Sequence, residues 1–310
     1  MKILINRKPI YNQPWGGGNN FVKAFVNYGS LRDHKIIYTL EDDIDCIFMQ
    51  DPRSSELGIS ANEIVKYKLE NKNTIIVHRV NECDVRKGTD YMDTLLKSCS
   101  IYSDITLFVS KWAKEYHNKF GWCCKNQHVL YNGVDKEVFK PNEKIDNGKV
   151  NIVTHHWSNN EMKGFDIYRK LDELVKVDER FTFTYIGRED GTLLNTKIVK
   201  PLFGKELGRE LGKYDIYISA SRFDPGPNHI LEALACGIPT YAYIDGGGCL
   251  EMVGLNHIYS STSSLFDFIL SGGHKRQNFD FKLKSWEECM EECFSVLENH
   301  MINLAHKGCS

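Results

Sequence analysis

The stretch Ser219-Ala-Ser-Arg-Phe-Asp-Pro-Gly-Pro-Asn-His-Ile-Leu-Glu-Ala-Leu-Ala-Cys-Gly-Ile-Pro-Thr240 holds the end of a strand, a loop, a complete helix and the start of the next strand. A Pro/Gly turn follows the predicted strand end near Ser219, and Asn228 is a favourable N-cap for the helix. Gly237 fits the end of that helix, and Pro239 leads into the next strand. This order places the loop at the carboxyl end of a parallel strand, where α/β sheets bind ligands and a helix N-terminus favours phosphate.

The same alternation of strand and helix runs along the whole chain. The predicted strands cover residues 3–5, 36–38, 44–48, 74–78, 105–109, 152–154, 181–186, 216–219 and 240–243. The predicted helices lie near residues 18–30, 61–71, 90–100, 111–120, 163–176, 204–212, 228–236 and 285–304. Apolar strands that alternate with helices are typical of α/β proteins, in which helices cover parallel sheets.

Midway along the chain, a turn-rich segment interrupts this alternation. It runs from Asn132-Gly-Val-Asp135 to Gly148 and holds a proline and several Asn and Asp residues. A chain of 310 residues also has the length of two ordinary domains. We therefore predict two Rossmann-like domains, residues 1–145 and residues 150–284, joined at this segment. The amphipathic final helix, residues 285–305, is expected to cross back and complete the first domain.

Composition and charge narrow the function. Lys plus Arg is 39 and Asp plus Glu is 41, so the chain has no basic excess with which to neutralise a nucleic-acid backbone. Nucleic acid is therefore not an expected partner. No stretch approaches the roughly 18 apolar residues of a transmembrane helix, and the first residues lack a signal-peptide core. The 10 cysteines form no C-x-x-C pair, which disfavours a zinc site and favours reduced thiols in the cytoplasm.

Two acidic residues carry the chemistry of the opening stretch. Asp224 lies in the loop and Glu232 lies eight positions later, in the helix, so both can face one crevice. The stretch resembles the E-x7-E region of family 4 retaining glycosyltransferases, which have the GT-B fold. Asp224 stands where the first Glu is usual, and Glu232-Ala-Leu-Ala-Cys-Gly-Ile-Pro matches closely. The resemblance implies that Asp224 binds hydroxyls of the donor sugar and that Glu232 binds the ribose of the nucleotide.

Three further segments resemble the same family in the expected order. Val129-Leu-Tyr-Asn-Gly-Val-Asp-Lys-Glu-Val-Phe-Lys-Pro is similar to the interdomain segment N-G-V-D-x-x-x-F-x-P. Thr154-His-His-Trp-Ser-Asn-Asn-Glu-Met-Lys-Gly-Phe is similar to the first strand and loop of the donor domain, and Gly246-Gly-Gly-Cys-Leu-Glu251 resembles the later G-G-x-x-E turn. The resemblance implies two Rossmann-like domains whose parallel sheets face a central cleft.

The resemblance also implies a reaction. A hexosyl group would pass from a nucleoside-diphosphate sugar to a hydroxyl of a carbohydrate or another acceptor, with retention at the anomeric carbon and without a metal cofactor. Residues 150–284 would bind the donor, and residues 1–145 would bind the acceptor. Lys163 would hold the leaving diphosphate. Relatives often carry Arg where this chain has Ser158, and Arg222 is the candidate to replace it. Peripheral contact with a membrane is compatible with this activity.

The candidate site residues come from loops of both domains. The residues expected to act in catalysis are Lys163, Asp224 and His78. The expected donor-binding residues are Gly17, Gly18, Lys163, Arg222, Asp224, Asn228, Glu232 and Gly247. The expected acceptor-binding residues are Arg79, Asn81 and Glu82, which follow a predicted strand at its carboxyl end. His78 would help to position the acceptor hydroxyl, although the departing phosphate can itself take the proton.

Two pairs of polar residues bear on metal binding. His155 and His156 are adjacent in a strand and should point to opposite faces, so at most one should reach the cleft and a metal-binding pair is not expected. Asp43-x-Asp45 is the pattern by which GT-A transferases bind a divalent ion, and oxygen ligands suit Mg²⁺ or Mn²⁺. A metal-dependent GT-A enzyme is therefore one alternative.

Two further alternatives keep the GT-B fold. A sugar-nucleotide epimerase or hydrolase would turn over the donor without an acceptor. A catalytically silent protein would bind a sugar nucleotide and turn over nothing. Ser158 and Asp224, where the chain departs from the family pattern, favour this last alternative.

Overall fold

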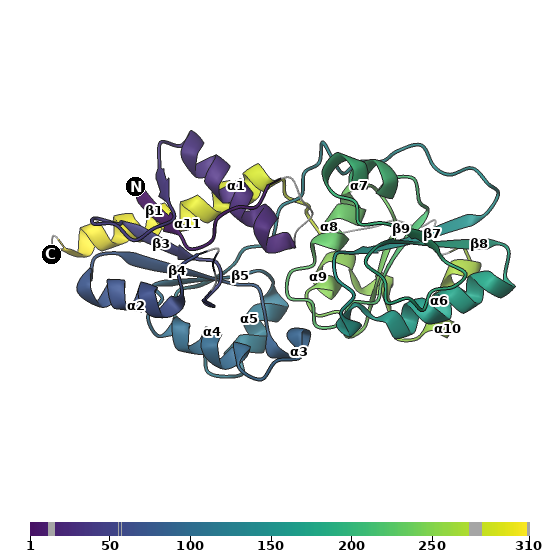
Figure 1. The fold of residues 1–310 in the computed structure, drawn as a ribbon, viewed down its shortest axis with the longest axis horizontal. Coiled ribbons are helices and arrows are strands. Elements are labelled where there is room, and N and C mark those ends of the chain that lie inside the picture. Colours follow the sequence, from purple (N-terminus) through teal and green to yellow (C-terminus); the bar gives the residue numbers. More distant parts are fainter. Residues whose placement is uncertain (12–15, 55, 57, 273–280, 309–310) are drawn as a thin grey trace.

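The computed structural model describes residues 1–11, 16–54, 56, 58–272 and 281–308, which form two units of strands and helices (Figure 1). The N-terminal unit contains the strands β1 (Lys2–Ile5), β2 (Lys35–Ile37), β3 (Cys46–Met49), β4 (Ile75–Val80), β5 (Ile105–Phe108) and β6 (Gln127–Val129). Its helices are α1 (Gly17–Leu31), α2 (Ala61–Glu70), α3 (Asp84–Lys87), α4 (Met92–Ser100), α5 (Lys111–Asn118) and the final helix α11 (Trp286–Gly308).

The C-terminal unit repeats this plan. Its strands are β7 (Val150–His156), β8 (Phe181–Gly187), β9 (Lys197–Val199), β10 (Ile216–Ser219), β11 (Thr240–Tyr243) and β12 (Ile258–Tyr259). Its helices are α6 (Phe165–Val177), α7 (Gly204–Leu211), α8 (Asn228–Ala235), α9 (Cys249–Val253) and α10 (Thr262–Leu270), with the 3-10 turns η1 (Glu161–Lys163) and η2 (Leu255–His257).

Each unit is built on a six-stranded sheet in which every strand pair is parallel. The strand order is β2-β1-β3-β4-β5-β6 in the first sheet and β12-β11-β10-β7-β8-β9 in the second. The direction of winding reverses between β1 and β3 in the first sheet and between β7 and β10 in the second. Such switch points open a crevice at the carboxyl ends of the strands, where doubly wound sheets bind ligands. The predicted α/β class with parallel sheets is confirmed.

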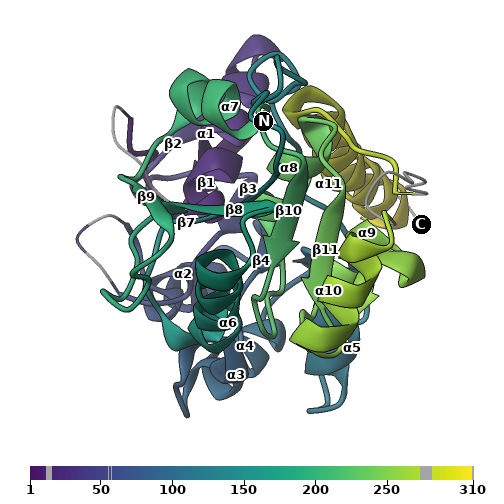
Figure 2. The same cartoon turned by 90° about the vertical axis from the view of Figure 1, so that its right-hand side faces the viewer.

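Helices on both faces bury the central strands. All residues of β3, β4, β5 and β10 are buried. In the C-terminal unit, α7 lies on one face of the sheet, and α6 and α10 lie on the other (Figure 2). The polar groups of the two sheets can therefore contact a ligand mainly in the loops at the ends of the strands. Within the described residues, no helix is long and apolar enough to span a membrane.

The final helix packs on the N-terminal unit, where it lies beside α1 (Figure 1). The ring of Phe294 stacks on that of Phe25, with centroids 4.8 Å apart, and Cys293 is fully buried in the same core. Gly29 of α1 allows this close approach, because a Cβ at this position would lie 3.1 Å from the Phe294 ring. The chain therefore crosses between the units twice, once after β6 and again before α11.

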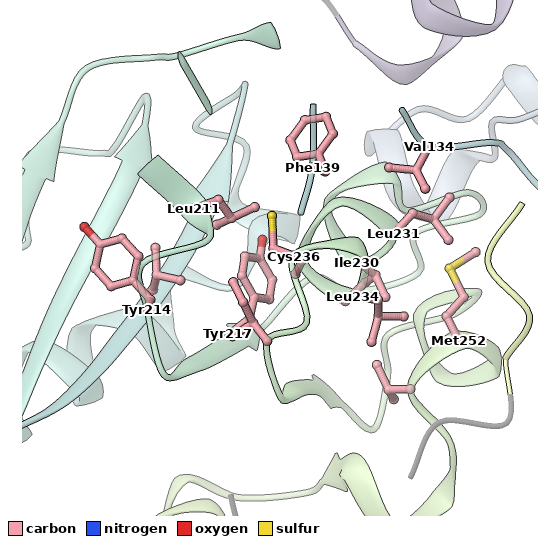
Figure 3. Close-up of a cluster of buried hydrophobic side chains, with 14 of the residues drawn as sticks. Val134, Phe139, Leu211, Tyr214, Tyr217, Ile230, Leu231, Leu234, Cys236 and Met252 are labelled. Atoms are coloured by element: carbon pink, nitrogen blue, oxygen red, sulfur yellow. The ribbon is translucent and has the colours of Figure 1, made fainter. Parts of the chain in front are cut away.

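These two crossings lie against each other. The N–H of Val134 donates to the carbonyl of Lys284 (3.0 Å), and a Cβ on Gly133 would lie 2.6 Å from the carbonyl oxygen of Ser285. Gly133 is thus needed for the close contact of the two segments. Val134 and Phe139 then join the buried cluster that surrounds α8 in the C-terminal unit (Figure 3). The linker is therefore anchored at its start and at Phe139, whereas most of residues 140–148 are exposed.

A third contact between the units involves Glu251 of α9. Its carboxylate accepts hydrogen bonds from the backbone N–H groups of Lys111 (3.1 Å) and Trp112 (2.5 Å) at the start of α5. It also accepts one from the hydroxyl of Tyr131 (2.6 Å). The side chain of Ser110 accepts a further N–H of the same helical turn. A carboxylate of the C-terminal unit therefore helps to cap a helix of the N-terminal unit.

Candidate functional site

A cavity of about 880 Å³ lies between the two units. Loops that follow β1 and β4 line it from the N-terminal unit, and loops that follow β7 and β10 line it from the C-terminal unit. These strands lie at or next to the two switch points, so the topology of the sheets explains the position of the cavity. The predicted site residues that line it are Gly17, Gly18, Arg79, Asn81, Glu82, Lys163, Asp224, Asn228 and Glu232.

Asp224 follows β10 and carries the negative charge at the centre of the site. Its backbone N–H donates to the carbonyl of Gly246 (3.2 Å), which fixes the loop. Its Oδ2 lies 2.8 Å from Nη2 of Arg86 and 3.6 Å from Nζ of Lys163. Burial alone would raise the pKa of Asp224, but the charges of Arg86 and Lys163 hold it well below its usual range. Asp224 is therefore an anion at neutral pH.

Lys163 approaches Asp224 from a tight turn after β7. It is the last residue of η1, and Gly164 follows it in the left-handed conformation, with a φ of 87°. A Cβ on Gly164 would overlap the carbonyl oxygen of Ala220. This close packing explains why glycine follows Lys163 in the sequence. Burial, together with the charge of Arg86, lowers the pKa of Lys163 to about 8. The charge of this lysine is therefore sensitive to pH just above neutrality.

Arg86 is a charged residue of this site that the sequence did not predict. It lies in the short helix α3 of the N-terminal unit and is buried. Its guanidinium crosses to the C-terminal unit, where Nη1 donates to the carbonyls of Met162 (2.6 Å) and Arg222 (2.8 Å) and Nη2 pairs with Asp224. The sequence signal was one arginine in a polar loop after a predicted strand, which ordinary solvated loops also contain.

Arg222, the candidate to replace the missing arginine at Ser158, is not among the residues that line the cavity. Its guanidinium makes two hydrogen bonds to the carboxylate of Asp166 at the start of α6 (2.8 and 2.7 Å). It also lies over the ring of Tyr243. These partners direct the side chain away from the cavity, and only the backbone carbonyl of Arg222 faces the cluster of charges.

Glu232 reaches the cavity from α8 and is paired there. Its Oε2 lies 2.7 Å from Nε2 of His155 at the end of β7. His156 also lines the cavity, which corrects the expectation that at most one of the two histidines reaches it. Strand alternation does not separate them because β7 ends at His156 and the cavity surrounds that end. Burial lowers the pKa of His156 well below its usual value, so it is neutral, with Nε2 2.6 Å from the hydroxyl of Tyr168.

Asn228 is the first residue of α8, and Pro227 precedes it as the N-cap, so the predicted cap is one residue off. The carboxamide oxygen of Asn228 accepts a hydrogen bond from Nδ2 of Asn132 in the linker (2.6 Å). Gly17, at the start of α1, lies next to this carboxamide. The N-termini of α1 and α8 therefore meet at the cavity from opposite units.

The residues expected to bind an acceptor line the cavity in the N-terminal unit. Arg79 is buried, and its Nη2 donates to Oδ1 of Asn132 in the linker (2.6 Å). Glu82 pairs with Lys87 (2.8 Å), and burial raises the pKa of the Glu82 carboxyl group. Arg79 thus supports the linker, whereas Asn81 and Glu82 are side chains that an acceptor in the cavity can meet.

Besides Arg222, two other predicted site residues, His78 and Gly247, lie outside the cavity lining. His78 is fully buried, and its ring stacks on Trp122 with centroids 5.8 Å apart. Its neighbour Arg79 takes the opposite face of β4, so strand alternation directs His78 into the core. Burial lowers the pKa of His78 to about 3, and its ring is not placed in the cavity to meet an acceptor hydroxyl. Gly247 is bridged to the backbone of Asp224 at a φ of 66° and shapes the loop.

The Asp43-x-Asp45 pair also lies away from the cavity. Oδ2 of Asp45 accepts a hydrogen bond from the backbone N–H of Lys2 at the start of β1 (2.7 Å). Asp43 has a φ of 57° in the turn before β3. In the part of the chain that the structure describes, no group of three or more His, Cys, Asp or Glu side chains is arranged to hold a metal ion.

No protein-family model matches this chain, and no curated protein matches its sequence. Solved structures do match. HepE from Anabaena, solved in complex with UDP-glucose, aligns with a TM-score of 0.65 and 12% identity over 99% of this chain and 100% of that one. Sucrose-phosphate synthase from Thermosynechococcus elongatus aligns with a TM-score of 0.63 and 12% identity over 98% and 97% of the two chains. The lipopolysaccharide outer core galactosyltransferase WaaB aligns with a TM-score of 0.62 and 14% identity over 98% and 99%. The chain therefore has the GT-B fold of these glycosyltransferases, which confirms the predicted fold.

Proposed function

We propose that this protein is a retaining glycosyltransferase that moves a hexosyl group from a nucleoside-diphosphate sugar to an acceptor hydroxyl. The observation that carries the proposal is the cluster of Arg86, Lys163 and Asp224 in the cavity between the units. Two cations share one carboxylate, so the cluster has a net positive charge that suits a diphosphate. HepE, which has the same fold, was solved with UDP-glucose, and this supports a sugar nucleotide as the ligand.

In this proposal, the C-terminal unit, residues 150–284, binds the donor. Lys163 pairs with the diphosphate, whose negative charge grows as its bond to the sugar breaks. Asp224 accepts hydrogen bonds from sugar hydroxyls, and Glu232 accepts them from the ribose. The N-terminus of α8 adds partial positive charge beside the same ligand. Lys163 would thus contribute most to the rate of transfer, and Glu232 would contribute most to nucleotide binding.

The N-terminal unit, residues 1–145 with the final helix, binds the acceptor. Asn81 and Glu82 are available to hydrogen-bond its hydroxyls. Because His78 is buried and neutral, the departing diphosphate takes the proton of the acceptor hydroxyl. The anomeric carbon loses its bond to the phosphate oxygen and gains a bond to the acceptor oxygen on the same face. The proton ends on the phosphate, so no other reactant is needed.

Two further points belong to the same proposal. Transfer needs no metal ion, because basic side chains supply the positive charge that a divalent ion supplies in metal-dependent transferases. The protein acts in the cytoplasm, where its thiols stay reduced. The nine cysteines within the described residues are free, which supports a reducing compartment.

A protein that binds a sugar nucleotide without transferring the sugar is a second candidate. Ser158 stands where relatives often have Arg, and Asp224 stands where the first Glu of the motif is usual. Both features favour binding over turnover. An epimerase or hydrolase with the same fold would consume the donor in the absence of any acceptor.

A panel of UDP-, GDP- and ADP-sugars in a thermal-shift assay tests the proposal. A true donor should raise the melting temperature by mass action. The donor that does so is then incubated with candidate hydroxyl acceptors, with and without EDTA, and the products are followed by NMR. Transfer with a retained anomeric configuration in EDTA would support the proposal. Binding without transfer would favour the silent protein, and consumption without acceptor would favour the epimerase or hydrolase. No shift with any sugar nucleotide would overturn all three.

A further inference from the structure

The cations that line the cavity are divided unequally between the units. Within the described residues, Lys163 is the only lysine or arginine of the C-terminal unit on the cavity wall, whereas Lys23, Arg79, Arg86 and Lys87 come from the N-terminal unit. A leaving nucleoside diphosphate carries about two negative charges, and one ammonium group does not balance them. Among the described residues, the unit proposed to bind the donor therefore has no second lysine or arginine of its own on the cavity wall.

Arg86 is the cation of the N-terminal unit that enters the proposed donor site. One of its acceptors is the carbonyl of Met162, the residue directly before Lys163. Another is the carbonyl of Arg222, two residues before Asp224, and the third is the Asp224 carboxylate. Arg86 thus contacts both of the loops that supply the charged groups for the donor. Its side chain is only 9% exposed, so little solvent screens its charge.

The other cations of the N-terminal unit have partners elsewhere. Lys87 pairs with Glu82 (2.8 Å), Arg79 donates to Asn132 (2.6 Å), and Lys23 lies over the ring of Tyr11 (5.3 Å). In the cluster of Arg86, Lys163 and Asp224, by contrast, one carboxylate faces two cations. No second carboxylate among the described residues pairs with Arg86 or Lys163, so one positive charge remains unbalanced at the edge of a cavity large enough for a ligand.

The backbone that carries Arg86 is fixed to the N-terminal unit. Asp84, at the start of α3, accepts hydrogen bonds from the hydroxyl of Thr89 (2.5 Å) and the backbone N–H of Met92 (2.8 Å). Gly88 ends α3 in the left-handed conformation, with a φ of 66°. Arg86 must therefore move with the N-terminal unit, while Lys163 and Asp224 move with the other. The cluster is complete only when the units are closed.

We propose that Arg86 is the second cation of the diphosphate site and that the opposite unit delivers it. This inference rests on the proposed donor. In the free protein, the guanidinium holds the units together through Asp224 and the two carbonyls. When the donor binds, sugar hydroxyls take up the Asp224 carboxylate and the guanidinium pairs with the diphosphate. Closure of the units and neutralisation of the leaving group are then one event.

Four variants test this proposal. Arg86→Gln removes the charge, and Arg86→Lys keeps it but cannot donate in a planar fork. Arg222→Gln tests the arginine that the sequence suggested. Arg169→Gln is the matched control, because it also removes an ion-paired arginine (2.7 Å from Asp190) but lies outside the cavity lining. Calorimetry measures the affinity for UDP, GDP, ADP and their monophosphates. Small-angle scattering measures the radius of gyration of each ligand-free protein.

We expect Arg86→Gln to lower the affinity for the diphosphate that wild type binds best by about 10- to 100-fold, as is typical for loss of a charged hydrogen bond. The affinity for the monophosphate should fall much less, because a cation beside the sugar-binding Asp224 lies nearest the outer phosphate. Arg86→Gln should also enlarge the ligand-free protein, and Arg86→Lys should do so while keeping more of the affinity. Arg222→Gln and Arg169→Gln should match wild type in both measurements.

Wild-type affinity in Arg86→Gln, or an equal loss in Arg222→Gln, would overturn the assignment of the second cation. If wild type binds none of the three diphosphates, it is the proposed donor that fails. The scattering comparison would then still test whether Arg86 holds the two units together in the ligand-free protein. An unchanged radius of gyration in both Arg86 variants would show that this residue does not hold the units together.

Discussion

Gly17 and Asn228 belong to opposite units, yet no methyl group fits between them: a Cβ on Gly17 would lie 2.6 Å from Nδ2 of Asn228. Gly17 is the first residue of α1, and Asn228 is the first residue of α8. Helix N-termini carry partial positive charge and attract anions. The missing side chain at position 17 therefore allows two such termini to approach one ligand from both sides of the cleft.

Gly17→Ala should weaken binding of the nucleoside diphosphate by roughly fivefold or more, measured by calorimetry. The new methyl group would push the Asn228 carboxamide away from Asn132 and cost one hydrogen bond, about 1 kcal/mol. Gly16→Ala is the matched control, because a Cβ there meets no atom of the described residues within 4 Å and its φ of −64° suits alanine. In an Asn228→Ala background, Gly17→Ala should add little. A full additive loss in the double variant would contradict the proposed clash.

Asp224→Asn and Glu232→Gln should have opposite effects on the bare nucleoside diphosphate. Neutralising Asp224 leaves Arg86 and Lys163 facing the ligand without a competing anion, so Asp224→Asn should bind at least as tightly as wild type. Its turnover should fall, because the sugar loses a charged acceptor. Glu232→Gln should reduce the binding free energy of the bare nucleotide by about 1.5–3 kcal/mol, the typical contribution of a charged hydrogen bond. Equal weakening by both variants in calorimetry would contradict the division of roles.

The affinity for the diphosphate should decline as the pH rises through about 8, the pKa to which burial and Arg86 lower Lys163. A bound anion favours the charged lysine, so binding near pH 8 should take up protons. Calorimetry in two buffers with different ionisation enthalpies measures this uptake, and Lys163→Met should abolish it. In the free protein, the unfolded chain binds more protons than the folded one between pH 8 and the ordinary lysine pKa of about 10.4. The Lys163 contribution to stability should therefore become more favourable as pH rises across that window.

His78→Phe should leave transfer within about threefold of wild type. The His78 ring is fully buried, and neither of its nitrogens has a hydrogen-bond partner among the described residues. An apolar ring of similar shape removes those unpaired polar atoms, so the melting temperature should not fall. Rates and thermal denaturation measured together check both points. A hundredfold loss of rate in a folded variant would restore a direct role for His78 in catalysis.

The sequence predicted the central strands of both sheets because their physical signal is local. The predicted strands at residues 216–219 and 240–243 coincide with β10 and β11, whose apolar side chains are buried on both faces. The edge strands β6, β9 and β12 were not predicted. Lys197–Val199 is largely exposed, and Ile258–Tyr259 has only two residues, so neither has a continuous apolar run. Edge strands are defined by the neighbour with which they pair, and that pairing is not a local property.

The difference between local and long-range signals also explains which site residues could be predicted. Asp224 and Glu232 lie in one strand–loop–helix unit, so the spacing of the sequence already places them together. Arg86 meets Asp224 across 138 positions of chain, and no pattern near Arg86 reveals this partner. Arg222 was misplaced for the same reason, because Asp166 in another helix determines the direction of its side chain. Side-chain direction at the cleft depends on the packing of the two units.

The carboxylate of Glu251 makes the folding of the N-terminal unit depend on the C-terminal unit. Residues 1–145 contain a complete parallel sheet, yet two backbone N–H groups at the start of α5 have their acceptor in the other half of the chain. A fragment ending at residue 145 would also lack α11 and would expose the rings of α1 that Phe294 covers. Such a fragment should therefore unfold less cooperatively than its complete sheet suggests. The intact chain should unfold in one coupled transition, because neither half is a self-sufficient folding unit.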